Sequence, residues 1–164
     1  NVEHFIVASD AAATGTFADF AALKGETVAL GARNSGTIGS NTTLLEGLGL
    51  DVETDFELFE GGYGPSAEAL QNGQVKGVSI PAGAPAGAVS QLFASVGDGV
   101  TMLDFTDEEI ATADGGKELW TRYVIPAGTY PGQEADLNTI AQPNFLAVRG
   151  DVSEENVYLI TKTI

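Results

Sequence analysis

The residues with the strongest chemical signal lie at positions 31–37, in the stretch Gly-Ala-Arg-Asn-Ser-Gly-Thr. This polar, glycine-containing segment follows the apolar run at 27–30 and precedes a helix-like pattern, so it predicts a turn from a strand into a helix. In such a turn the free backbone N–H groups at the start of the helix can face a negatively charged ligand. The segment therefore indicates an anion-binding helix start.

Motifs for catalysis are incomplete around this segment. The stretch from Gly31 to Gly36 has the spacing of a phosphate-binding P-loop. Thr37 and Ile38, however, stand where that motif requires lysine followed by serine or threonine. Arg33 occupies a glycine position both of the dinucleotide-binding fingerprint and of the serine-hydrolase elbow. Nucleotide hydrolysis, dinucleotide binding and serine hydrolysis are all disfavoured.

No other residue supplies the missing chemistry. The only histidine, His4, is predicted to be a surface residue or a strand side chain, and no pair of carboxylates stands out. The acids at 107–109 are explained by a capping box that begins at Thr106. Cysteine is absent, which excludes disulfides, thiolate catalysis and zinc–thiolate sites. We therefore expect no catalytic residue, no metal site and no cofactor, and a binding protein rather than an enzyme.

Acidic residues dominate the charge of the chain. There are 23 Asp and Glu residues against 7 Lys and Arg residues, which gives a formal net charge of −16. Such a charge repels phosphate backbones and anionic membrane surfaces. Nucleic acid is therefore not an expected partner.

Strand-like and helix-like patterns alternate along the chain, which predicts an α/β fold with a mostly parallel sheet and helices on both faces. Ligands bind such sheets at the carboxyl ends of the strands, so the loops at 31–37, 61–64 and 81–85 are expected at one edge. The predicted strands are 2–7, 27–30, 56–59, 78–80, 101–105 and 123–125, with an extended segment at 138–148. The predicted helices are 17–23, 37–48, 65–71, 88–95, one that starts after Thr106 and one that starts after Ser153. Thr16 and Ser35 are candidate N-caps of the first two, and Asp19 is expected to form a weak capping pair with Thr16.

The length of 164 residues is that of one well-cored domain. The first eight residues lack the pattern of a signal peptide, and the last predicted helix has no stop signal. We therefore expect the chain to be a fragment of a larger protein.

Three stretches of the chain occur together in a family-specific order. They are LKGETVALGARNSGT at 23–37, AGAPAGAV at 82–89 and IPAGTYPGQ at 125–133. In sequence, order and spacing they resemble the TAXI family, the TRAP-associated extracytoplasmic immunogenic proteins. These proteins are solute receptors of tripartite ATP-independent periplasmic transporters.

The resemblance implies a two-lobed periplasmic receptor of the type II binding fold, which closes on a small organic anion such as glutamate or a related dicarboxylate. It implies that residues 1–164 form the second lobe, with the segment from about 138 to 164 leading back toward a missing first lobe. The membrane subunits of the transporter are the implied protein partners.

By position, the resemblance also implies a set of ligand-binding residues. Two residues depart from the family pattern, since Asn34 stands where glycine is usual and Ile38 stands where an acidic residue is usual. The implied ligand-binding residues are Asn34, Ser35, Gly36, Thr37, Ala82, Gly83 and Tyr130.

Two other classes of protein fit the same patterns. A transferase-like enzyme of similar fold would act on an anionic substrate and would need a base near the three loops, and a one-lobed interaction module would need no small ligand. For the receptor, a single lobe is expected to bind anions only at millimolar level or not detectably. Apolar surface near Tyr130 and Phe145 is expected to cause some self-association.

Overall fold

The central sheet has five strands in the order β3-β2-β4-β1-β5 in the computed structural model, which describes residues 1–164. The β2 strand is parallel to β3 and β4, whereas β1 is antiparallel to both β4 and β5. The mostly parallel sheet is thus confirmed, with β1 reversed. The strands are β1 (Phe5–Ala8), β2 (Thr27–Ala29), β3 (Glu57–Leu58), β4 (Gly77–Ser79) and β5 (Val100–Met102).

The reversal of β1 determines which residues share an edge of the sheet. Because β1 runs against its neighbours, its amino end lies beside the carboxyl end of β4, with Phe5 opposite Ser79. Glu3 and His4 therefore lie at the edge where β2, β3 and β4 end.

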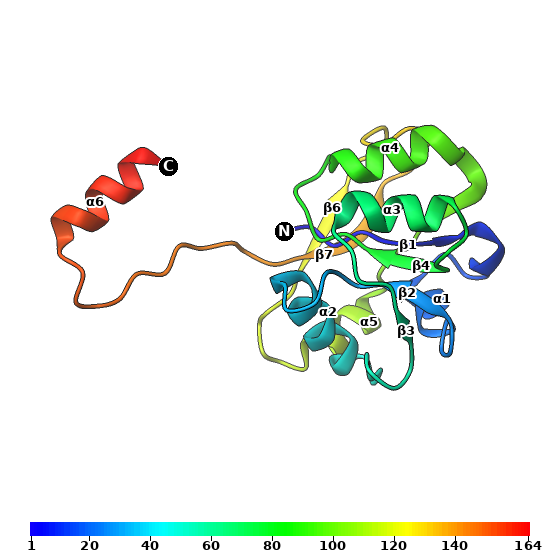
Figure 1. The fold of residues 1–164 in the computed structure, drawn as a ribbon, viewed down its shortest axis with the longest axis horizontal. Helices are drawn as coiled ribbons and strands as arrows, with labels where there is room; N and C mark the ends of the chain where they lie inside the picture. Colours follow the sequence, from blue (N-terminus) through cyan, green and yellow to red (C-terminus); the bar gives the residue numbers. More distant parts are fainter.

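Helices cover both faces of the sheet, as predicted (Figure 1). The α3 and α4 helices pack on one face through a core that includes Leu70 and Val89. The other face carries α1, α2 and α5 over a core that includes Phe20 and Leu44. The helices are α1 (Phe17–Ala21), α2 (Gly36–Gly47), α3 (Tyr63–Gln71), α4 (Gly87–Val96) and α5 (Asp107–Asp114), with short 3₁₀ turns at Ser9–Ala11 and Gly97–Gly99.

Side chains cap four of the helices at the residues that the sequence indicates. The capping residues are Thr16, Ser35, Thr106 and Ser153, and Thr106 forms the full capping box with Glu109. Asp19 differs from the expectation of a weak capping pair with Thr16. Its carboxylate instead accepts bonds from the amides of Thr14 and Gly15, because the turn before the helix brings these N–H groups closer.

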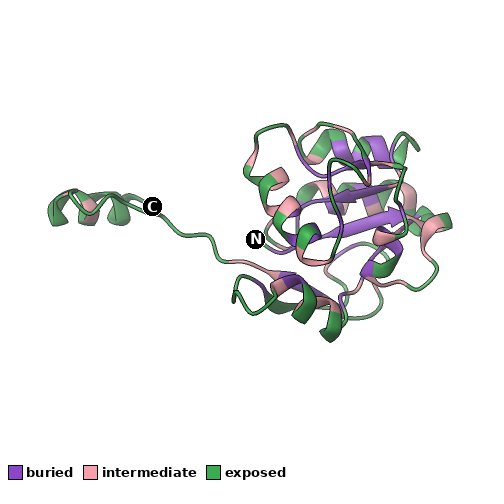
Figure 2. Cartoon of the chain, turned by 90° about the horizontal axis from the view of Figure 1, so that it is seen from below, coloured by how far each residue is buried: buried purple, intermediate pink, exposed green.

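A two-stranded ribbon connects the body to the end of the chain. It consists of β6 (Thr121–Ile125) and β7 (Leu137–Ala141), which pair antiparallel. The predicted extended segment at 138–148 forms a strand only as far as Ala141. The chain then leaves the body and ends in α6 (Glu154–Thr163), which lies apart from the sheet and has no buried residue (Figures 1 and 2). No helix combines the length and apolar character needed to cross a membrane.

Candidate functional site

Three loops that follow β2, β3 and β4 meet at one edge of the sheet, as the sequence predicts. Tyr63, the first residue of α3, joins them. Its hydroxyl donates a hydrogen bond to the carbonyl of Pro81 at 2.6 Å and lies 3.3 Å from Oγ1 of Thr37. Since the one hydroxyl hydrogen of Tyr63 is used on Pro81, the Thr37 hydroxyl donates to Tyr63. The Thr37 hydroxyl is therefore engaged within the protein.

The turn after β2 depends on two residues with left-handed backbone. Gly31 has φ +117°, and a Cβ atom there would lie 2.8 Å from Cγ2 of Thr37, so only glycine fits. Asn34 has φ +59°, a conformation that asparagine tolerates better than most residues. Asn34 thus keeps the backbone shape that a glycine at this position would provide.

The start of α2 presents unpaired donors at this edge. Oγ of Ser35 accepts from the amide of Ile38 at 3.3 Å, which leaves the hydroxyl hydrogen of Ser35 free. The amides of Gly36 and Thr37 have no acceptor within the protein. These three donors, aided by the positive end of the helix dipole, suit an anion.

The start of α4 lies at the same edge, since α4 follows the loop after β4. The amides of Gly87 and Ala88 likewise have no acceptor within the protein. In the preceding loop, Ala82 pairs with Val2 through both backbone groups, at 2.8 and 3.0 Å. Gly83 is exposed, with open space where a side chain would be. Gly83 is thus accessible to a ligand, whereas the backbone N–H and C=O groups of Ala82 are already hydrogen-bonded to Val2.

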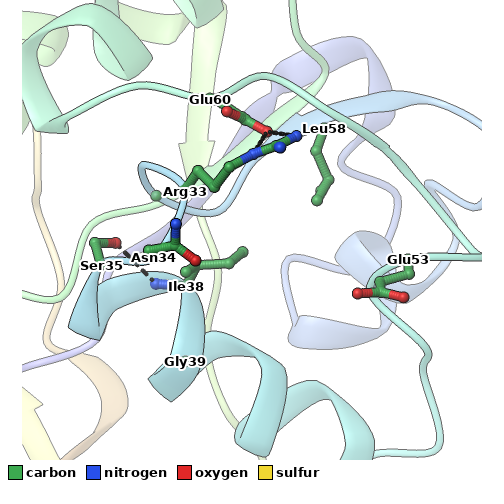
Figure 3. A pocket seen from close by; sticks show the side chains of 9 residues that line it. Arg33, Asn34, Ser35, Ile38, Gly39, Glu53, Leu58 and Glu60 are labelled. Carbon is green, nitrogen blue, oxygen red and sulfur yellow. Dashed lines mark hydrogen bonds and ion pairs between the residues drawn. The ribbon is translucent and has the colours of Figure 1, made fainter.

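An open pocket of about 640 Å³ lies between the start of α2 and β3 (Figure 3). Arg33 spans it, because Nε and Nη2 lie 2.9 and 2.8 Å from Oε1 of Glu60. Asn34 and Ser35 line this pocket, whereas the other predicted ligand residues do not. The lining residues are Gly31, Arg33, Asn34, Ser35, Ile38, Gly39, Glu53, Leu58 and Glu60.

Tyr130 is buried under the loop after β4, with only 2% of its surface exposed. Its hydroxyl accepts from the amide of Ala86 at 2.9 Å and lies 2.6 Å from Nε2 of His4. Nδ1 of His4 lies 2.8 Å from the carbonyl of Ile80 and must donate to it, so Nε2 accepts from Tyr130. Tyr130 thus supports the loop that leads into α4.

His4 is fully buried, which excludes the surface position that the sequence allowed. Burial lowers the pKa of His4, consistent with a neutral ring whose two nitrogens are both engaged. His4 is therefore not free to act as a base toward Ser35.

A second buried network holds α2 on the sheet, and sequence reasoning missed it. Nδ2 of Asn41 donates to the carbonyl of Leu30, and Oγ of Ser79 donates to Oδ1 of Asn41, both at 2.9 Å. The network joins α2 to the ends of β2 and β4. An asparagine at a core-facing position of the helix was the available signal.

Glu3 is a further buried ionisable group at this edge. Burial raises the pKa of its carboxyl to about 7, and its Oε2 atom has no hydrogen-bond partner. Oε1 lies 3.5 Å from Nε2 of Gln142, at the point where the chain leaves the body.

Solved structures with the same fold are periplasmic binding proteins. The aliphatic sulphonate binding protein SsuA from Escherichia coli is 18% identical, with a TM-score of 0.50 over 99% of this chain and 41% of SsuA. A TctC solute binding protein from Polaromonas is 15% identical, with a TM-score of 0.50 over 99% of this chain and 50% of that protein. The chain thus spans half or less of the length of these proteins.

The model of the NMT1-like family matches residues 1–164, which is the whole of the sequence. Together with the α/β sheet and the loops gathered at its edge, this match gives the chain the fold of a substrate-binding protein lobe. The chain belongs to the NMT1-like family.

Proposed function

We propose that this chain is one lobe of a two-lobed extracytoplasmic solute receptor that binds a small organic anion. The observation that carries the proposal is the set of unpaired donors at the start of α2, on Ser35, Gly36 and Thr37. The start of α4, at the same edge, adds further free amides. The chain matches half or less of the length of two periplasmic binding proteins, which supports the proposal that the receptor has another lobe besides this one.

The energetics of binding favour a site shared between two lobes. A hydrogen bond to a charged group contributes about 1.5 to 3 kcal/mol. Micromolar affinity requires about −8.2 kcal/mol after the costs of association have been met. The three donors at the start of α2 supply at most about 9 kcal/mol in total, which does not also cover association costs of about 4 to 15 kcal/mol. Closure of a second lobe would add donors and exclude water, which strengthens the existing bonds.

The proposed transporter class and solute follow from the resemblance to the TAXI family. We propose that the receptor serves a tripartite ATP-independent transporter in the periplasm and that its membrane subunits recognise the closed form. Glutamate and related dicarboxylates are the proposed solutes. Sulfonates belong in the same test, because the structurally similar SsuA is a sulphonate binding protein.

The ion pair between Arg33 and Glu60 allows a test of this proposal in which two variants are expected to change anion affinity in opposite directions. Glu60 competes with an incoming anion for the guanidinium of Arg33, because both nitrogens of Arg33 contact Glu60. Glu60→Gln is expected to tighten anion binding by the two-lobed receptor, and Arg33→Gln to weaken it. Lys76→Gln is the charge-matched control, because Lys76 pairs with Asp10 before the start of β4, at the opposite edge.

Calorimetric titration with glutamate, succinate and an alkanesulfonate measures these effects. Equal affinities for the wild type and both pocket variants would remove Arg33 from the site. If none of the anions binds to the wild type, the proposed solute class is wrong. The transferase alternative predicts turnover of a substrate, and no contact at this edge favours it, since His4 is occupied by Tyr130 and Ile80.

A further inference from the structure

Gln142 stands where the chain leaves the lobe. Its backbone pairs with Asn1 in both directions, with N–H···O distances of 2.8 and 2.9 Å. The neighbouring residues Val2 and Ala141 also form a bridge. The first and the last segments of the folded body therefore run side by side at this point.

The side chain of Gln142 joins three elements. Its Nε2 group donates to Oγ of Ser40, one turn inside α2, and lies 3.5 Å from Oε1 of Glu3. An amide nitrogen carries two hydrogens, so both acceptors can be served together. We call the chain that leaves the lobe after Gln142 the departing segment. Gln142 thus connects this segment to Glu3, just before β1, and to α2, whose first turn carries the free donors.

Beyond Gln142 the chain has few ties to the lobe. Asn144 bonds to the side chain of Asn1 at 3.0 Å. From Asn144 onward almost every residue is exposed, and α6 lies away from the sheet (Figure 2). A change in the direction of the departing segment must therefore occur close to Asn1 and Gln142.

We propose that Gln142 is a positioning residue that couples the direction of the departing segment to the first turn of α2. This inference rests on the proposed function, because it treats the segment as the connection to a second lobe. When the lobes close, the segment turns about the pair of Asn1 and Gln142. The bonds to Glu3 and Ser40 transmit that turn to α2, so the donors at Gly36 and Thr37 are aligned in the closed form.

The polarity of the contact with Glu3 allows a rescue experiment. At pH 8, where Glu3 is ionised because its raised pKa is about 7, Gln142→Glu places two carboxylates against each other and breaks the contact. The double variant Glu3→Gln/Gln142→Glu restores an amide facing a carboxylate, with the two roles exchanged, and the Ser40 hydroxyl can donate to the new carboxylate. Gln142→Ala removes both bonds without adding charge. Gln91→Ala is the matched control, because Gln91 is an exposed glutamine on α4 whose side chain makes no hydrogen bond.

The first measurement needs no ligand. In the 164-residue chain, Gln142→Ala and Gln142→Glu are expected to shift the backbone amide resonances of Gly36 and Thr37. The double variant is expected to return these resonances toward their wild-type positions. Gln91→Ala is expected to leave them unchanged. In the two-lobed receptor, Gln142→Ala is expected to weaken anion binding about tenfold, the size of losing one to two side-chain bonds in a coupled site. Spin-label distances between the lobes are expected to broaden in the same variants.

Unmoved Gly36 and Thr37 resonances in Gln142→Ala would overturn the coupling, whatever the receptor binds. So would wild-type affinity and lobe distances in Gln142→Ala. The absence of anion binding by the wild-type receptor would instead overturn the proposed function. In that case the amide resonances and the lobe distances still decide the coupling.

Discussion

The hydroxyl of Tyr130 lies 2.6 Å from Nε2 of His4, in the interior of the lobe. The same hydroxyl accepts from the amide of Ala86 at 2.9 Å, immediately before α4. Tyr130 lies in the loop between β6 and β7. It contacts the end of the loop after β4 directly through Ala86, and it is linked to the start of that loop through His4, which donates to Ile80. This contact positions the start of α4 at the edge where the anion is proposed to bind.

Removal of the Tyr130 hydroxyl should destabilise the lobe. Tyr130→Phe leaves Nε2 of His4 and the amide of Ala86 buried without partners, and each unpaired group costs about 1 to 3 kcal/mol. We expect a loss of roughly 2 to 4 kcal/mol in the free energy of unfolding, measured in urea. Tyr123→Phe is the control, because Tyr123 lies on β6 with a side chain that makes no hydrogen bond. Equal stabilities of the two variants would contradict this contact.

The free energy of unfolding of the lobe should depend on pH through two buried groups, Glu3 and His4, whose contributions change in opposite directions with pH. Glu3 keeps its proton in the folded state up to a pKa of about 7, against an ordinary value of 4.5. Between these values the folded state binds more protons, so the Glu3 contribution falls as the pH rises. The pKa of His4 is lowered below 6.5, so the unfolded chain binds more protons there and the His4 contribution falls as the pH drops.

The variant Glu3→Gln separates the two contributions. At pH 8 the glutamine carries no charge to bury, so we expect it to raise the free energy of unfolding by roughly 3 kcal/mol, since one pKa unit corresponds to about 1.4 kcal/mol. The gain should shrink as the pH falls toward 4.5. Urea unfolding at several pH values measures it, and a pH-independent effect would contradict a buried, proton-binding Glu3.

The bond from Asn41 to the sheet should also be important for stability. Asn41→Ala leaves the carbonyl of Leu30 and the hydroxyl of Ser79 without their partner in a buried site. We expect a loss of about 2 kcal/mol in the free energy of unfolding. Asn156→Ala on the exposed α6 is the control and should change stability by less than about 0.5 kcal/mol. A cost of similar size in both variants would show that Asn41 does not tie α2 to the sheet.

The sequence was sufficient to predict most elements near the site. The alternation of strands and helices, the caps at Ser35 and Thr106, and the gathering of three loops all follow from local patterns. The reversal of β1 was not predictable in this way, because strand direction depends on which neighbours pair across the sheet. The expected capping role of Asp19 failed for a local reason, since earlier N–H groups lie closer to its carboxylate.

The contacts that support the site were harder to predict than its loops. The pairing of His4 with Tyr130 joins residues 126 positions apart, and a single sequence carries no signal for it. The resemblance implied that Tyr130 is part of the ligand site. Its burial beneath the α4 loop makes it a support for the amides of Gly87 and Ala88.

The expected exposed apolar surface is found at Phe145 but not at Tyr130, and it continues onto α6. Tyr130 is buried, but Phe145 is 84% exposed, and Tyr158 and Leu159 on α6 are exposed as well. We expect concentration-dependent self-association of the 164-residue chain in light scattering, stronger at high salt because salt screens the net charge of −16. Phe145→Ser with Leu159→Ser should reduce it. A strictly monomeric wild type at high salt would contradict this expectation.

An NMR titration of the 164-residue chain with glutamate, succinate and an alkanesulfonate, with chloride as the control for ionic strength, tests the proposed anion site most directly. We predict shifts concentrated at the amides of Gly36, Thr37 and Ala88, with dissociation constants in the millimolar range because only one wall of the site is present. Anion-specific shifts confined to other parts of the lobe would contradict it. Micromolar affinity of a monomeric chain would also contradict it, because the site would then be complete without a second lobe.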